Sequence, residues 1–195
     1  MIVILTTIKK TEIDSFEGLD LNVGDVFDFT LKDGEEVQAM VVEKEQNKAL
    51  CILVDCLRDE YSMNDTHTTK GGWEGSKLCK ILNSEILERF PDEVRKAMMP
   101  FANGDYLRLP TEREIFGKAY YSEEDERVQQ FEPMKERRNR RALQGKNGDR
   151  REFWWLSSVA GTYSFCFVYA GGGLTSYYGA GASFSVRPLF IISTL

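Results

Sequence analysis

The sequence has few of the residues that build metal sites or imidazole-based catalytic centres. It contains one histidine, His67, and four cysteines among 195 residues. The cysteines form no close pair with metal-ligand spacing, and a chain of this length does not need disulfide bonds to hold its core. We therefore interpret Cys51, Cys56, Cys79 and Cys166 as buried thiols and His67 as a solvated loop residue, and we expect no metal and no cofactor.

Excess positive charge and long apolar runs are also missing. The 25 Lys and Arg against 31 Asp and Glu give a net charge of −6, so no whole-protein field attracts nucleic acid. The apolar start, residues 1–5, is followed closely by Lys9 and Lys10 and is too short for a signal peptide or a membrane span. We expect no nucleic-acid partner, no membrane anchor and no export signal.

The composition, 42% hydrophobic and 29% charged, predicts a folded protein with one well-buried core. Apolar residues alternate through 26–31 and 37–41 on either side of Asp33-Gly34, which is typical of a β-hairpin. Residues 49–54 form an unbroken apolar run, which predicts a strand buried on both faces. The first third should therefore form a sheet.

Helical spacing follows in the middle third. Apolar residues from Leu78 to Phe90 fall on one stripe of a helix, and Pro91 suits the first turn of a second short helix. Thr111 and Glu114 form a capping box at the start of a third. The sequence predicts one α+β domain over 1–195, in which 1–60 are mainly β, 73–120 helical, 121–151 a charged loop and 152–195 a Gly- and aromatic-rich β meander.

The charged loop segregates its charges. Residues 123–126 are all acidic, whereas residues 135–151 hold eight basic residues against two acidic ones. Because no aromatic residues interleave the basic run to stack on bases, we interpret it as a solvated segment neutralised by the acidic cluster. A phosphate-contacting patch is the alternative.

Residues 157–185 contain no charged residue and no His, Asn, Gln, Met, Trp or Pro. Aromatic residues alternate with smaller ones in the first part, so a strand there would carry four rings on one face. The segment is either a core meander or a recognition surface, since Tyr and Phe with Ser and Gly are typical of antibody-like binding sites. The candidate ligand-binding residues are Tyr163, Phe165, Phe167, Tyr169, Ser176, Tyr177, Tyr178 and Phe184.

The flanks of this segment carry a family resemblance. Phe153-Trp154-Trp155-Leu156-Ser157-Ser158 and Ser185-Val186-Arg187-Pro188 resemble the Trp-Trp-Leu-Arg-Ser-Pro and Gly-Val-Arg-Pro stretches of bacterial and phage C-type-lectin-like domains of the DUF6273 type. Upstream, Trp73-Glu74-Gly75-Ser76-Lys77-Leu78 and residues 107–112 resemble the helix opening and the strand-to-helix junction of that family. The resemblance covers roughly residues 20–195. Departures at Ser157-Ser158-Val159 and Ser185 weaken the expectation of a standard loop conformation.

The resemblance implies a C-type-lectin-like fold and a non-enzymatic module that binds a protein or glycan ligand. Trp73, Trp154, Trp155, Arg187 and Pro188 would be scaffold residues. The fold is shared with the variable proteins of diversity-generating retroelements, and the residue types in 157–185 obey the exclusions of adenine-directed mutagenesis. We therefore hypothesise that 157–185 includes a diversified region.

Two alternatives remain from the same resemblance. Formylglycine-generating enzymes share the broad fold, but their chemistry needs a cysteine pair and the C-terminal segment offers Cys166 alone. A phage tail or virion component is the other alternative, so the expected location is cytoplasmic or virion-associated. Self-association is left open.

Overall fold

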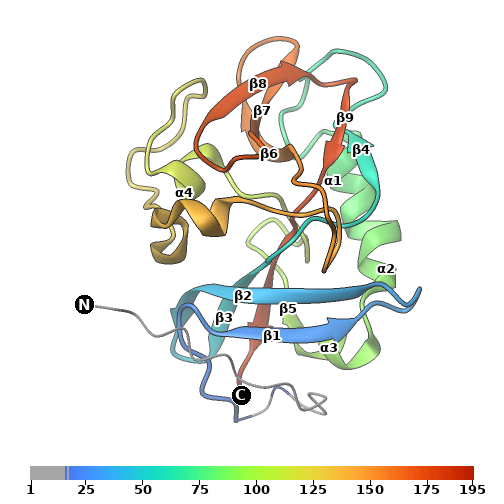
Figure 1. Cartoon of the computed structure of the whole chain (residues 1–195), viewed down its shortest axis with the longest axis vertical. Helices are drawn as coiled ribbons and strands as arrows, with labels where there is room; N and C mark the ends of the chain where they lie inside the picture. Colours follow the sequence, from blue (N-terminus) through green and yellow to red (C-terminus); the bar gives the residue numbers. More distant parts are fainter. Residues whose placement is uncertain (1–15, 17) are drawn as a thin grey trace.

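Two five-stranded sheets form the framework of the computed structural model, which describes residues 16 and 18–195 (Figure 1). The first sheet has the order β1 (Val26–Thr30), β2 (Glu36–Glu45), β3 (Lys48–Leu53), β10 (Leu189–Ser193), β5 (Met98–Met99). The second has the order β4 (Glu60–Ser62), β9 (Ser183–Ser185), β6 (Trp154–Val159), β7 (Ser164–Val168), β8 (Thr175–Gly179). The last strand of the chain thus lies inside the sheet that the first strands build.

The predicted hairpin is confirmed. β1 and β2 pair antiparallel from Val26 opposite Met40 to Thr30 opposite Glu36, and Gly34 takes a φ of 87° in the turn. β3 pairs with both β2 and β10, and its Cys51, Ile52 and Leu53 are buried completely. An apolar run without alternation fits this central position because neither face of the strand meets water.

Four short α-helices, a π-helical turn and two 3-10 helices, Glu132–Lys135 and Arg137–Arg140, complete the mixed α+β fold of the described residues. α1 (Lys77–Ile81), a π-helical turn (Leu82–Ile86) and α2 (Leu87–Arg89) follow one another, and the stripe that includes Leu78, Leu82 and Ile86 is buried. α3 (Asp92–Ala97) follows Pro91 directly. α4 (Glu112–Phe116) begins with the predicted capping box of Thr111 and Glu114.

The predicted C-terminal meander is confirmed only for β6, β7 and β8, which pair antiparallel in succession. β9 instead pairs with β4 and meets β6 at the single parallel position of Trp154 and Ser185. β10 returns to the first sheet, where Leu189, Phe190 and Ile192 are buried between β3 and β5. Apolar residues at 189–192 favour this central position over an edge of the second sheet.

A further part of the predicted organisation lies outside the described residues. The apolar start at residues 1–5 belongs to the segment for which no structure is given. Across residue 16 and residues 18–195, every helix falls short of the length and apolarity that a bilayer crossing requires.

Arg187 joins the two sheets. Its side chain is 1% exposed; Nε donates to the Leu53 carbonyl of β3 at 2.9 Å, and Nη1 donates to the Asn139 carbonyl at 3.1 Å. The guanidinium lies 4.7 Å from the Trp154 ring centroid, so it also stacks on β6. Burial lowers the pKa of Arg187, and the carbonyl contacts and ring compensate part of that cost.

Replacing Arg187 by Met should remove about 3 kcal/mol from the free energy of unfolding, because the buried Leu53 carbonyl and the half-buried Asn139 carbonyl lose their donor and the Trp154 ring loses its cation. Urea denaturation measures the change. The matched control is Arg127→Met, since Arg127 is solvent-exposed, and it should change stability by less than about 0.5 kcal/mol. Equal effects of the two substitutions would contradict the joining role of Arg187.

Candidate functional site

The second sheet carries the candidate binding residues, but it does not expose all of them. Phe165 and Phe167 are 0% and 5% exposed, whereas Tyr163 and Tyr169, just outside the two ends of β7, are 64% and 42% exposed. The expectation of one exposed row of rings is therefore wrong for Phe165 and Phe167. Both rings belong to the main hydrophobic core, which also contains Trp155, because that part of the sheet face is covered.

A chain of ring contacts leads from this core to the surface. Phe167 lies 4.9 Å from Phe184 and 5.1 Å from Tyr169, measured between ring centroids. Phe153 contacts the same three rings at 5.5 to 5.9 Å, and Tyr178 contacts Phe184 at 5.7 Å. Exposed Phe153 and Tyr169 thus rest on buried Phe167, and Tyr178 rests on half-buried Phe184, which restricts their movement.

A second group of rings lies beyond β8. Tyr177 pairs opposite Cys166, whereas Tyr178 pairs opposite Phe165, so the side chains of the two tyrosines project from opposite faces of the sheet. Tyr177 contacts Tyr121 with centroids 5.1 Å apart. Both rings are about half exposed, at 49% and 45%.

The buried carboxylate of Glu112 fixes the loop that carries the second group. Its Oε2 accepts hydrogen bonds from the backbone N–H groups of Tyr120, Tyr121 and Ser122 at 3.0 to 3.2 Å, and from the Ser122 hydroxyl at 2.8 Å. A charged acceptor makes strong bonds to backbone donors, so this loop is held in one conformation. Tyr120, which is 61% exposed, is thereby presented beside Tyr121.

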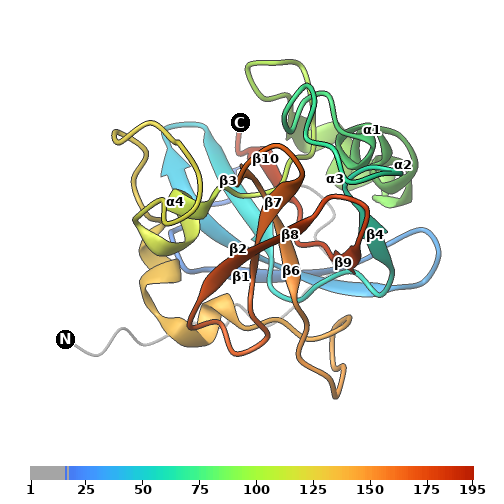
Figure 2. The same ribbon diagram turned by 90° about the horizontal axis from the view of Figure 1, so that it is seen from above.

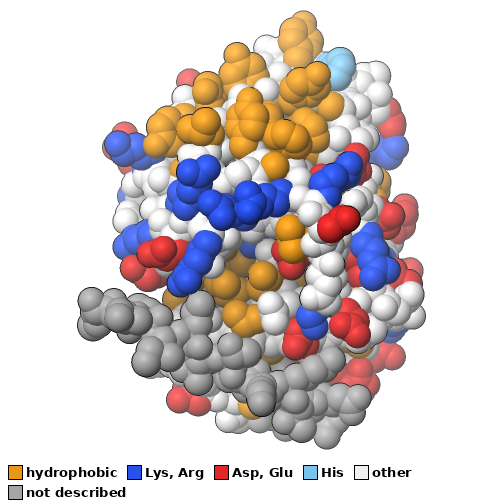
Figure 3. Space-filling model, viewed as in Figure 1, with side chains coloured by type: hydrophobic (Ala, Val, Ile, Leu, Met, Phe, Trp, Pro, Cys, Tyr) orange, Lys and Arg blue, Asp and Glu red, His pale blue; other side chains and the backbone are white. Residues whose placement is uncertain are grey.

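These exposed side chains form what we call the aromatic surface. Figure 3 shows hydrophobic side chains gathered over the end of the molecule that the second sheet builds, and Figure 2 looks down on that end with β7 and β8 toward the viewer. Contiguous apolar patches of this kind are uncommon on monomers without a partner. The aromatic surface consists of two groups of rings on either side of β8, with Leu174 in the β7–β8 turn. One group is Phe153, Tyr169, Tyr178 and the partly exposed Phe184, and the other is Tyr177 with Tyr120 and Tyr121 of the neighbouring loop.

The remaining predicted residues lie around this surface. Tyr163 is exposed next to the end of β8, where its carbonyl accepts from Ala180 at 2.9 Å, and Ser176 is half-buried on β8. Sequence reasoning missed Tyr120, Tyr121, Phe153 and Leu174. Their aromatic or apolar character was visible, but only the fold brings Tyr121 beside β8 and Phe153 beside β7 and β9.

The predicted scaffold residues lie beneath the surface. Trp154 and Trp155 are fully buried, and their indole N–H groups donate to the carbonyls of Arg140 at 3.1 Å and Tyr61 at 2.8 Å. Pro188 is buried beside Arg187, and Trp73 is half-buried against the main core. The indole rings therefore support β6 from both of its faces.

An open pocket of about 630 Å³ with a mixed polar and apolar lining adjoins the aromatic surface at Tyr121. Trp73, Ser122, Glu124 and Ser157 are among its lining residues. Glu124 accepts hydrogen bonds from the backbone N–H groups of Glu112 and Arg113 at 3.2 and 2.9 Å, so this carboxylate caps α4. One residue of the acidic cluster, Glu124, thus has a structural role at the start of α4.

The basic run contacts different partners from those expected. Nε of Arg137 and Nε of Arg141 both donate to the Gly171 carbonyl, at 2.9 and 3.3 Å, and Nε of Arg140 donates to the Gly172 carbonyl at 2.7 Å. The prediction that the acidic cluster neutralises these residues is wrong, because their side chains reach the β7–β8 turn instead. This turn joins Tyr169 to Leu174 of the aromatic surface.

All four cysteines are buried free thiols, as predicted. Burial raises the pKa of Cys166 well above its usual range, and nearby Glu112 and Glu124 raise it further. Burial and Asp105 raise the pKa of Cys79 to about 12. Cys79 lies in α1 and Cys166 in β7, so neither position offers the reactive thiolate that nucleophilic chemistry needs.

His67 is exposed in its loop, as predicted, and its Nδ1 accepts a hydrogen bond from the Gly181 N–H at 3.1 Å. Within the part of the chain that the structure describes, no group of three His, Cys, Asp or Glu side chains has the arrangement of a metal site.

The site therefore belongs to an α+β protein that exposes a supported aromatic face. The chain belongs to the family described as a domain of unknown function, DUF6273, whose model matches residues 46–194. This confirms the family part of the resemblance. Comparisons with curated proteins and with solved structures gave no match.

The raised thiol pKa values predict that the folded protein does not react with Ellman's reagent at pH 8, since the thiols stay protonated and covered. All four should react after unfolding in urea. Rapid labelling of Cys166 in the folded protein would contradict this prediction and would revive the formylglycine-type alternative.

Proposed function

We propose that this protein is a non-enzymatic binding module that recognises a protein ligand through the aromatic surface. The observation that carries the proposal is the exposure of Phe153, Tyr169, Tyr177 and Tyr178 on fixed supports. Phe153, Tyr169 and Tyr178 contact other rings of the second sheet, and Tyr177 contacts Tyr121 in the loop that Glu112 holds. Aromatic side chains of this kind give a large contact area and lose few rotamers on binding. A glycan ligand is the alternative within the same proposal.

Edge geometry supports recognition of a protein. β8 is the last strand of its sheet, and its residues include no charge and no proline to discourage pairing. Every second residue of an antiparallel edge strand forms a hydrogen-bonded pair with the neighbouring strand. The N–H and C=O groups of the residues in between point to the open edge. The backbone bonds from Tyr169 to Leu174 and from Ala180 to Tyr163 flank this pairing, so Ser176 and Tyr178 form the hydrogen-bonded pairs with β7 between them. Tyr177 lies between Ser176 and Tyr178, and its N–H and C=O therefore point to the open edge.

The proposal also includes a C-type-lectin-like fold for this chain. A C-type-lectin-like fold accounts for the pairing of β10 with β3 and for the buried positions of Trp154, Trp155 and Arg187 between the binding segment and the first sheet. Residues 157–185 would then be the ligand-binding segment of that fold. It supplies Tyr169, Leu174, Tyr177, Tyr178 and Phe184 to the aromatic surface.

A diversified origin of this segment, in a phage or prophage, is the second element of the proposal. Its exposed residues, such as Tyr163 and Tyr177, could change without altering the core, whereas Phe165 and Cys166 could not. A near-identical template repeat and a reverse-transcriptase gene beside this gene would support diversification, and their absence would contradict it.

Selection of random displayed peptides on the protein tests the binding role. Peptides that bind the wild type should lose affinity by at least about thirtyfold, or about 2 kcal/mol, in a Tyr169→Ser, Tyr178→Ser double variant. Exposed Tyr106 lies outside the aromatic surface, so Tyr106→Ser is the matched control and should bind unchanged.

Circular dichroism should show that all three proteins are folded, since exposed rings contribute little to stability. Peptides that bind the double variant and the wild type equally would contradict the proposal. Glycan binding that is lost in the double variant, without any peptide binding, would support the glycan alternative and contradict the protein one.

A further inference from the structure

The turn between β7 and β8 brings positive charges together. Arg137 and Arg141 donate from Nε to the same oxygen, the Gly171 carbonyl, so their guanidinium groups lie side by side. Arg140 reaches the adjacent Gly172 carbonyl, and Arg138 is exposed between them in the sequence. Figure 3 shows a band of Lys and Arg side chains directly below the hydrophobic surface.

The arginines of this cluster, Arg137, Arg138, Arg140 and Arg141, form no ion pair with a carboxylate of the described residues. Glu136 is the one acidic residue in 135–148, and its side chain is exposed. Burial and then the neighbouring Arg137 lower the pKa of Arg140, whereas nearby Tyr120 and Glu136 raise it.

Glycine at the turn makes the arrangement possible. A Cβ at Gly173 would come within 2.8 Å of Arg137 Cζ, and a Cβ at Gly172 within 2.8 Å of the Arg141 backbone nitrogen. The φ of Gly172 is 64°, a conformation that also favours glycine. Residues 137–141, the arginine segment, therefore pack directly on the turn. The Nε bonds fix the directions of the Arg137 and Arg141 guanidinium groups, whose Nη groups have no hydrogen-bond partner among the described residues, whereas Nη1 of Arg140 donates to the Met134 carbonyl at 2.6 Å.

We infer that Arg137 and Arg141 form a site for a carboxylate or phosphate group of an acidic protein ligand. An oxyanion can accept hydrogen bonds from two planar guanidinium groups at once and relieves their mutual repulsion. The inference rests on the proposed function, because Tyr169 and Leu174 at the ends of the same turn belong to the aromatic surface. The apolar side chains of such a ligand would contact the aromatic surface, and its acidic groups would bind the arginines at the edge of that surface.

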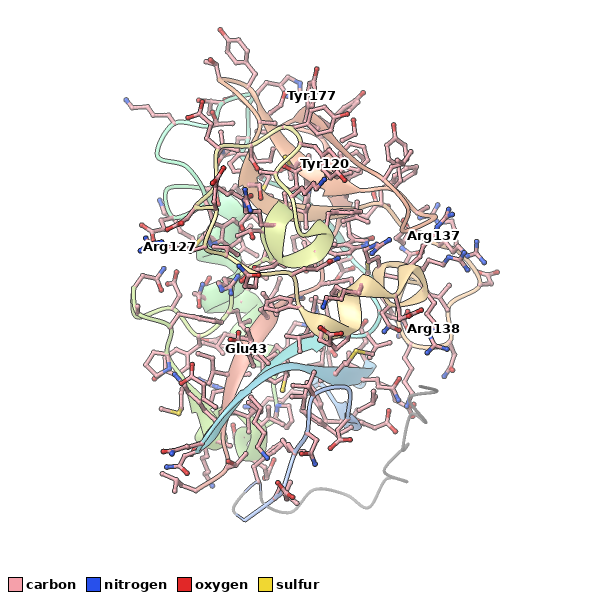
Figure 4. The ribbon with its side chains drawn as sticks, turned by 90° about the vertical axis from the view of Figure 1, so that its left-hand side faces the viewer. Glu43, Tyr120, Arg127, Arg137, Arg138 and Tyr177 are labelled. Carbon is pink, nitrogen blue, oxygen red and sulfur yellow. The ribbon has the colours of Figure 1, made fainter. Side chains whose placement is uncertain are left out.

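Small anions test this site without any aromatic contact. Inorganic phosphate and succinate, titrated at constant ionic strength, should each shift the side-chain Nε–H resonances of Arg137 and Arg141 and raise the thermal unfolding midpoint. An Arg137→Ser, Arg141→Ser double variant should weaken anion binding by at least about tenfold. Arg127→Ser is the matched control, because Arg127 lies on the other side of the molecule from Arg137 and Arg138 (Figure 4) and pairs with Asp125.

A second variant separates geometry from charge. Gly173→Ala keeps the net charge but displaces the Arg137 guanidinium, so it should also weaken anion binding while phosphate still affects Arg141. Absence of anion binding by the wild type, or equal binding by the Arg137→Ser, Arg141→Ser and Arg127→Ser proteins, would overturn the site. Either result would leave the peptide experiment on the aromatic surface unaffected, so the two proposals fail separately.

Discussion

The buried guanidinium of Arg187 is the interaction on which the rest of the structure depends. It contacts Leu53 of the first sheet, the ring of Trp154 in the second sheet and the Asn139 carbonyl within the arginine segment. One side chain therefore fixes β6 and also the residues on either side of Asn139. A shorter or uncharged side chain could not reach all three partners with the same planar geometry.

This framework allows the second sheet to expose apolar residues without losing its shape. Exposed rings and an uncharged edge strand are hazards for a free protein, because they favour unwanted association. Here they rest on Phe167, Phe184 and Trp155, and the loop that carries Tyr120 and Tyr121 is tied to Glu112. The stability of the protein comes from the layers beneath, so the outer side chains are free to serve recognition.

Much of the fold could be predicted from the sequence, because its signals are local. The hairpin at Asp33-Gly34, the stripe from Leu78 to Phe90 and the capping box at Thr111 each depend on neighbours a few residues away. The position of β10 could not be predicted in this way, since a buried apolar strand fits either sheet by composition alone.

The candidate site was predictable only in part, for the same physical reason. Alternation placed Phe165 and Phe167 with Tyr163 and Tyr169, but it carries no information on how far the core covers that face. Phe153 and Tyr121 join the site through contacts between distant segments. The sequence predicted a solvated segment for the arginines, because their partners are backbone carbonyls and any residue can supply a carbonyl.

Photochemically induced dynamic nuclear polarisation (photo-CIDNP) NMR tests most directly the central claim that the rings of the aromatic surface are exposed. An excited dye polarises the nuclei only of aromatic rings that it can contact. We expect polarised signals from Tyr169, Tyr177 and Tyr178, which are 42%, 49% and 55% exposed, and none from Trp154 and Trp155, which are fully buried. Silent tyrosines together with polarised tryptophans would contradict the account, since the rings assigned to recognition would then form the core.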